Sequence, residues 1–233
     1  MGKSLAVIHR NPALNHQIKL AEQFAAGFKR SGQAWVITSD QGKAGDIHVV
    51  LGPHYALNQW RNHHRCVWVD RAFWGDPECV SVGWSAGIDR KFPAGAGWRN
   101  HPELVPWTDG RDCIVLADYG DTGLDLAALV RPHCERVEIR RHPAEGGSGA
   151  LSDALQEFQI AIGRNTSALV EAAISGLSVV CKSPRNPVMP IASASIRDLV
   201  QPDRNEWLRG LSWANWSGSE IESGELWECL TTA

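Results

Sequence analysis

Short runs of apolar and β-branched residues recur in the N-terminal part of the chain, separated by polar or glycine-containing segments. The runs at 4–10, 34–39, 47–52 and 66–71 predict buried strands. Between the first two, the apolar spacing at 15–32 predicts an amphipathic helix closed by Gly32. Strands that alternate with helices favour a parallel sheet built from βαβ crossovers.

The pattern weakens between residues 71 and 111, where glycine, proline and tryptophan are frequent, and then resumes. Strand-like runs at 112–117, 136–140, 158–162 and 177–181 predict a second sheet. From residue 203 the chain looks helical, and Ser217 followed by Glu220 fits a capping box for a final helix at 220–230. The sequence therefore predicts an α/β protein with domains at 1–105 and 106–200 and C-terminal helices at 201–233.

Composition restricts the partners. The 233 residues carry a net charge of −3 and a pI near 6.3, so nucleic acid or an anionic membrane could be bound only through a local basic patch. No apolar run approaches the roughly 20 residues of a membrane span, and the N-terminus lacks a signal-like stretch. We expect a soluble, cytoplasmic protein; nothing in the sequence indicates its oligomeric state.

Three loops should meet at one edge of the second sheet, because ligands of open parallel sheets bind outside the carboxyl ends of the strands. Together these loops and the helix after the third offer positive charge, a polar helix start and an acceptor, which are the groups that a nucleoside diphosphate needs. The residues concerned are Arg140, Arg141 and His142; Arg164, Asn165, Thr166 and Ser167; and Glu171, one turn beyond Ser167. Helix caps and solvated strand ends are the alternative interpretation.

The loop "DYGDTG" adds Asp118, Gly120 and Asp121 to the predicted nucleotide-binding residues. The two aspartates resemble a metal pair, but aspartate near glycine is also ordinary turn chemistry, and Asp121 could cap the next helix. We therefore predict no metal site and expect turnover without a divalent ion. No P-loop and no G-x-G-x-x-G follows a strand, which argues against a kinase and a dinucleotide dehydrogenase.

The segment 136–182 resembles the second half of GT-B glycosyltransferases, most closely the capsule-polysaccharide and glycerophosphate-transfer types. The matching residues are His142 and Pro143 in one element, and Ser167, Glu171, Ala172, Gly176 and Val179 in the other. The resemblance implies two Rossmann-like domains facing a cleft, with C-terminal helices that cross back to the first domain. It also implies that Ser167 lies near the donor phosphate and Glu171 near the ribose. The chain is short for this family.

Sugar transfer by direct displacement needs a base that accepts the proton of the acceptor hydroxyl. The family motifs do not locate it, and we expect it at a strand end of the first domain. Asp70, after the strand at 66–69, is our first candidate, and His9 and His16 are the alternatives. Asp70 could equally pair with Arg71 or cap a loop, and His9 could be a hydrogen-bonded histidine in a turn.

These features predict a glycosyltransferase that uses a nucleotide sugar, most simply a UDP-sugar, and no tightly bound cofactor. A nucleotide-sugar 2-epimerase or hydrolase, or a catalytically degenerate nucleotide-sugar-binding protein, would share the same donor residues. The chain's ending also resembles uncharacterised phage proteins. That likeness suggests host cytoplasm and a hydroxymethylated pyrimidine in DNA as acceptor, a surface polysaccharide being the other choice. For DNA, the cluster at 90–101 could hold the backbone while Trp98 stacks on a base.

Overall fold

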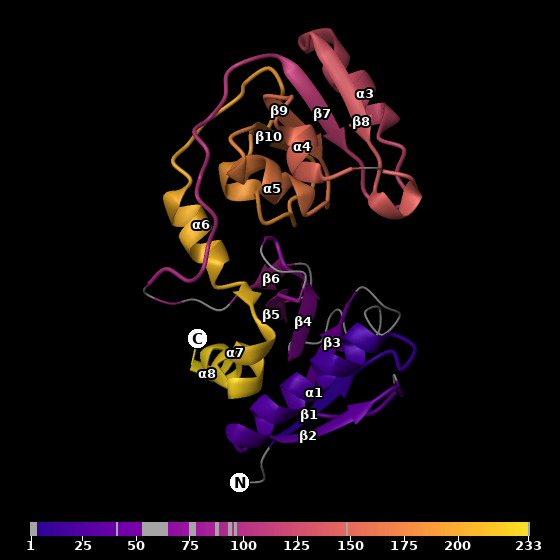
Figure 1. Ribbon diagram of the computed structural model, residues 1–233, viewed down its shortest axis with the longest axis vertical. Helices are drawn as coiled ribbons and strands as arrows, with labels where there is room; N and C mark the ends of the chain where they lie inside the picture. The colour runs from indigo at the N-terminus through magenta and orange to yellow at the C-terminus, as the bar shows by residue number, and fades with distance from the viewer. Residues whose placement is uncertain are drawn as a thin grey trace. The chain divides into compact units, whose positions relative to one another are not determined.

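The computed structural model describes residues 4–40, 42–52, 65–74, 78–86, 89–92, 95, 97–147 and 149–232 (Figure 1). Its contacts divide the chain into two compact units. Unit 1 comprises residues 1–101 and 209–233, and unit 2 comprises residues 102–208. The helix α6 (Asn205–Ser212) contains the junction at which the chain leaves unit 2 and re-enters unit 1.

The strands described in unit 1 form one sheet in the order β11-β5-β4-β3-β1-β2, with β6 paired to β5. These strands are β1 (Leu5–His9), β2 (Ala34–Thr38), β3 (Ile47–Leu51), β4 (Cys66–Arg71), β5 (Val80–Ala86), β6 (Asp89–Lys91) and β11 (Asn215–Trp216). The four strands expected from the sequence, β1 to β4, are mutually parallel. Their order in the sheet is β2-β1-β3-β4. The chain therefore adds β2 on one side of β1 and then β3 and β4 on the other side.

The region 71–111 contains two strands that the sequence pattern did not predict. β5 runs antiparallel to β4, and β6 and β11 run antiparallel to β5. The signal was present, because Val80, Val82 and Trp84 alternate with small residues and pack against the core. The Gly, Pro and Trp residues on either side obscured it. The short strand β11 likewise interrupts the expected run of C-terminal helices.

The helix α1 (Asn15–Arg30) covers the core of unit 1 with Leu20, Phe24 and Phe28, spaced one turn apart. The helices α7 (Gly218–Ser223) and α8 (Glu225–Thr232) pack beside it. A β-carbon on Gly27 would lie 2.2 Å from the Ile221 carbonyl oxygen, so glycine permits the close approach of α1 and α7. The predicted capping box at Ser217 is present, but Gly224, with φ of +91°, ends α7 and separates it from α8.

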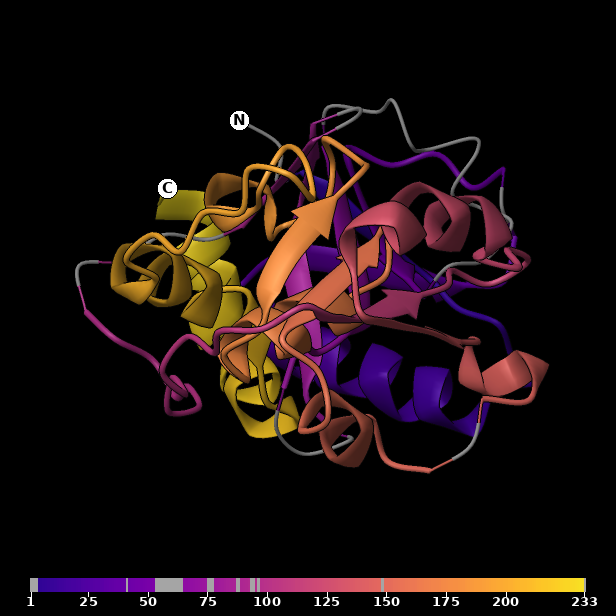
Figure 2. The same cartoon turned by 90° about the horizontal axis from the view of Figure 1, so that it is seen from above.

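Unit 2 contains an all-parallel sheet in the order β10-β9-β7-β8. The strands are β7 (Asp112–Leu116), β8 (Arg136–Arg140), β9 (Ile160–Gly163) and β10 (Ser178–Cys181). The crossover helices are α3 (Leu124–Val130), α4 (Leu151–Leu155) and α5 (Ala168–Ile174), and short 3₁₀ turns lie at Arg131–His133, Pro143–Glu145 and Met189–Ile191. α3 covers one face of this sheet, while α4 and α5 cover the other (Figures 1 and 2).

The predicted α/β class with parallel, Rossmann-like sheets is confirmed. In unit 2 the strand order reverses between β7 and β9, which is the switch point where open α/β sheets bind ligands. Apolar side chains of both strands, including Val115 and Ile162, are fully buried in one core cluster with Leu126 and Ala127 of α3. In the part of the chain that is described, no helix is long and apolar enough to cross a membrane.

Candidate nucleotide-binding site

The loops that follow β7 and β9 are tied together across the switch point of unit 2. Asp118 Oδ2 accepts a hydrogen bond of 3.0 Å from the Asn165 backbone N–H. Arg164 donates to Asp121 Oδ2 at 2.5 Å and also pairs with Asp125, and this hydrogen bond lowers the pKa of the Asp125 carboxyl. Two carboxylates therefore balance the charge of Arg164, which fixes the loops rather than offering an unopposed cation. The other carboxylate oxygen of Asp118 is buried and has no partner among the described residues.

The loop after β8 presents the cationic groups. Arg140 donates to the Gly149 carbonyl oxygen at 2.7 Å, and the Arg141 guanidinium has no partner within the described residues. His142 Nδ1 accepts the Ala144 backbone N–H at 3.2 Å, so a neutral His142 ring carries its proton on Nε2. That N–H, together with Arg141, can donate to an anionic ligand.

Two residues that the sequence analysis did not select connect the β7 loop to the β8 loop. Both carboxylate oxygens of Glu145 accept from the Gly120 N–H at 3.1 Å. Tyr119, which is 73 % exposed, packs edge-on against His142 with ring centroids 5.5 Å apart. Gly120 lies in the left-handed region, with φ of +79°, and is held by this carboxylate, so its N–H is already used.

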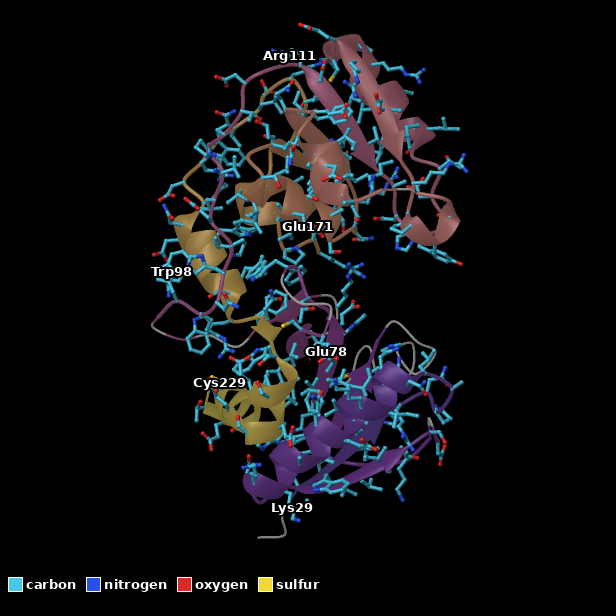
Figure 3. All side chains as sticks on the ribbon, viewed as in Figure 1. Lys29, Glu78, Trp98, Arg111, Glu171 and Cys229 are labelled. Carbon is cyan, nitrogen blue, oxygen red and sulfur yellow. The ribbon has the colours of Figure 1, made fainter. Side chains whose placement is uncertain are left out.

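At the start of α5, after β9, the capping side chain is Thr166 and not Ser167. Thr166 Oγ1 accepts from the Ala168 N–H at 3.2 Å, whereas the Ser167 hydroxyl has no hydrogen-bond partner among the described residues. Glu171 is half-buried on α5. Figure 3 shows Glu171 at the end of unit 2 remote from Arg111, which lies at the amino end of β7. Glu171 therefore lies at the end of the unit that carries the three loops.

A fourth loop, after β10, lies at the same carboxyl end of the sheet. The buried side chain of Asn186 donates to the carbonyl oxygens of Arg164 and Thr166 at 3.0 and 2.9 Å, and Ser183 donates to the Asn165 side chain. Lys182 directly follows β10 and donates to the Ala194 carbonyl at 3.1 Å. Applying the carboxyl-end rule to "CKSP" as well would have selected this loop.

A crevice of about 330 Å³ lies beside the β8 loop, on the face of the sheet covered by α4. Its volume falls within the ~300–1,000 Å³ range of small-molecule sites. The lining includes apolar Ile114 and Phe158, the carboxylates of Glu138 and Glu157, and Arg140 and Arg141. A β-carbon on Gly147 at its rim would lie 2.2 Å from the Arg141 carbonyl oxygen, so glycine is required for this close turn. The crevice thus continues from the same arginines that the sequence selected.

The candidate bases lie on different elements of unit 1. Asp70 is half-buried on β4 and accepts from the Arg71 backbone N–H at 2.8 Å. His9 ends β1 and is 5 % exposed; its Nε2 lies 2.9 Å from His48 Nδ1, and burial lowers its pKa. His16 is exposed in the first turn of α1. A general base must reach the acceptor hydroxyl, and His9 is much less exposed than Asp70 or His16. Its burial makes His9 the weakest of the three candidates.

The basic cluster at 90–101 lies partly outside the described residues, at positions 93, 94 and 96. Arg99 pairs with Glu220 and with Glu225, the latter at 3.2 Å, and its guanidinium stacks 3.6 Å from the centre of the Trp216 ring. Trp98 is 46 % exposed and packs against His101. Arg99 therefore stabilises unit 1 internally, which removes the central cation from the proposed DNA-binding cluster.

Comparison with known proteins identifies a solved structure of the same fold. No protein-family model matches the sequence, and no curated protein is similar to it. The solved structure of Thermosulfurimonas dismutans KpsC, beta Kdo 2,7 transferase, superposes with a TM-score of 0.52 at 12 % identity, over 96 % of this chain and 99 % of that one. The beta Kdo 2,4 transferase of the same organism's KpsC gives a TM-score of 0.40 at 12 % identity, over 92 % and 91 %. The chain shares its fold with the beta Kdo 2,7 transferase.

Proposed function

We propose that this protein is a glycosyltransferase that moves a sugar from a nucleotide-activated donor to a hydroxyl group. The observation that carries the proposal is the gathering of Arg140, Arg141 and His142 at the carboxyl end of β8, where the two arginines also line a crevice on the α4 face of the sheet. The departure of an anionic nucleotide from a sugar requires positive charge and N–H donors at that point. The fold shared with a Kdo transferase supports the same reaction class.

In this proposal the nucleotide sugar binds at the carboxyl ends of the unit 2 strands. Arg141 and the Nε2–H of His142 donate to the phosphate oxygens, because neither group is used by the described part of the fold. The crevice beside them receives the nucleoside. Glu171 accepts from the ribose hydroxyls. Arg164 positions the loops, since Asp121 and Asp125 already neutralise its charge.

Unit 1 supplies the acceptor side and the base, as the GT-B resemblance implies. The acceptor oxygen attacks the anomeric carbon, the bond from that carbon to the nucleotide's phosphate oxygen breaks, and the hydroxyl proton passes to a carboxylate. Asp70 is the candidate for that group, because it is a carboxyl side chain that is only half-buried at a strand end. The acceptor is a carbohydrate hydroxyl, and the fold shared with a Kdo transferase supports this choice. A DNA acceptor is less well supported, because Arg99 of the basic cluster is paired with Glu220 inside unit 1.

The test is a donor panel. The protein is incubated with uridine-, cytidine- and guanosine-activated sugars, an activated Kdo among them, with and without carbohydrate acceptors and with and without EDTA. We expect free nucleotide to appear only when donor and acceptor are both present, and EDTA to have no effect. Nucleotide release without any acceptor indicates a hydrolase or epimerase, and absence of release with every donor overturns the proposal.

The ribose assignment predicts that Glu171→Ala weakens nucleotide binding several-fold, because the net contribution of a hydrogen bond is about 0.5–1.5 kcal/mol. Isothermal titration calorimetry with uridine and cytidine nucleotides measures the change. Glu135→Ala is the matched control, since Glu135 is an exposed carboxylate at the amino end of β8. Equal affinities of the folded Glu171→Ala variant and the control would contradict the assignment.

A further inference from the structure

The strand β2 forms one edge of the unit 1 sheet and pairs only with β1 among the described strands. The Thr38 carbonyl oxygen accepts from the Arg10 N–H at 3.0 Å, so the backbone groups of Thr38 point toward β1. Backbone groups of successive strand residues point in alternating directions. Those of Trp35 and Ile37 therefore point outward, and each presents an N–H and a C=O along the edge.

This edge lacks the features that usually prevent strand pairing. Exposed edges are commonly protected by charged residues, by proline or by a bulge. β2 has the sequence AWVIT, with no charge and no proline, and it pairs with β1 in an unbroken register from Ala34 to Thr38. Trp35 is 39 % exposed. By contrast, the unit 2 edge strand β8 carries alternating charges at Arg136, Glu138 and Arg140.

We propose that β2 pairs antiparallel with β2 of a second copy of this chain, about a two-fold axis at Val36. In that register Trp35 of one copy and Ile37 of the other exchange both backbone hydrogen bonds, and the reciprocal pair does the same. The two Val36 residues face each other as the non-hydrogen-bonded pair. The outward backbone groups of each copy thus have the spacing that the other copy requires.

The side chains support the same register. Trp35 and Ile37 lie on one face of β2, since strand side chains alternate, and Ile37 packs against the core beneath α1. Pairing brings Trp35 of each copy onto Ile37 of the other, so the apolar layer continues from one sheet into the next. Aromatic residues opposite β-branched residues are favourable cross-strand pairs.

The absence of charge on β2 permits a second copy as the occupant, and it distinguishes β2 from the unit 2 edge strand β8. The same two-fold arrangement applied to β8 would place Glu138 against its own copy and Arg136 against Arg140, both like-charge pairs, which are unfavourable. Self-pairing of β2 opposes no charges at all. The inference is independent of the proposed enzymatic activity.

The test is sedimentation velocity over a wide range of protein concentration. We expect the wild-type chain to dimerise, and Val36→Lys or Val36→Glu to weaken the dimer by about tenfold or more, because each places like charges directly opposite. An equimolar mixture of the two variants should dimerise again, since Lys then opposes Glu. Leu129→Lys, at an exposed site on α3, is the control and should leave the dimer unchanged.

A second variant guards against misfolding of the Val36 variants. Trp35→Pro removes an N–H that points away from β1, so it should spare the sheet of unit 1 and still prevent pairing. Circular dichroism checks the fold. A wild-type chain that stays monomeric, a dimer that survives both Val36 variants, or a mixture that remains monomeric overturns the proposal.

Discussion

Replacing Asp70 by asparagine is expected to lower turnover by about 10²–10⁴-fold, the usual consequence of losing a general base. Nucleotide affinity should remain unchanged, because the donor groups belong to unit 2. The variant should fold, since an asparagine side chain retains an oxygen that accepts from the Arg71 N–H. Steady-state kinetics with saturating donor, combined with calorimetry, separates the lost proton transfer from lost binding.

Glu22→Gln, an exposed carboxylate on α1, is the matched control for removing a negative charge from unit 1. His16→Ala tests the exposed alternative. His9→Ala is expected to act on stability, because His9 is buried against His48. Near-full turnover in Asp70→Asn would show that the base lies elsewhere, and loss of turnover in a folded His16→Ala variant would assign it to α1.

The buried strands and the first helix were accessible to sequence analysis because their signals are local. Runs such as "IHVVL" in β3 and "DCIVL" in β7 are apolar over nearly their whole length, as expected for strands buried on both faces. The apolar spacing of α1 predicted its bounds to within about two residues. The carboxyl-end rule predicts from the sequence alone that the β7, β8 and β9 loops lie at the same end of the sheet.

Side-chain partners from distant segments could not be predicted in this way. Arg164 was selected as a donor group for the ligand, but its charge is balanced by Asp121 and Asp125, which lie 43 and 39 residues earlier in the chain. Nothing in the local pattern specifies those pairs. Asn186 poses the same problem, because it fixes the β9 loop through two backbone carbonyls that any sequence would contain.

A buried arginine near the end of unit 2 was also missed, because "PDRNEW" reads as an ordinary polar helix start. Arg204 is 5 % exposed and donates to the carbonyl oxygens of Ala173 and Val105, the latter at 2.5 Å. Its guanidinium lies 3.8 Å from the centre of the Trp107 ring. Burial lowers the pKa of Arg204, and the carbonyl oxygen in the last turn of α5 favours its positive charge. Arg204 thus connects the segment before β7 to α5.

Replacing Arg204 by alanine is expected to reduce the free energy of unfolding by about 3–5 kcal/mol. The buried carbonyl oxygen of Ala173 would lose a partner, at about 1–3 kcal/mol, and the desolvated contact with Trp107 adds about 2 kcal/mol. Urea unfolding followed by tryptophan fluorescence measures the loss. Arg197→Ala, on the exposed surface of the same unit, should change stability by less than about 0.5 kcal/mol. Equal stabilities of the two variants would mean that Arg204 does not hold the 102–108 segment against α5.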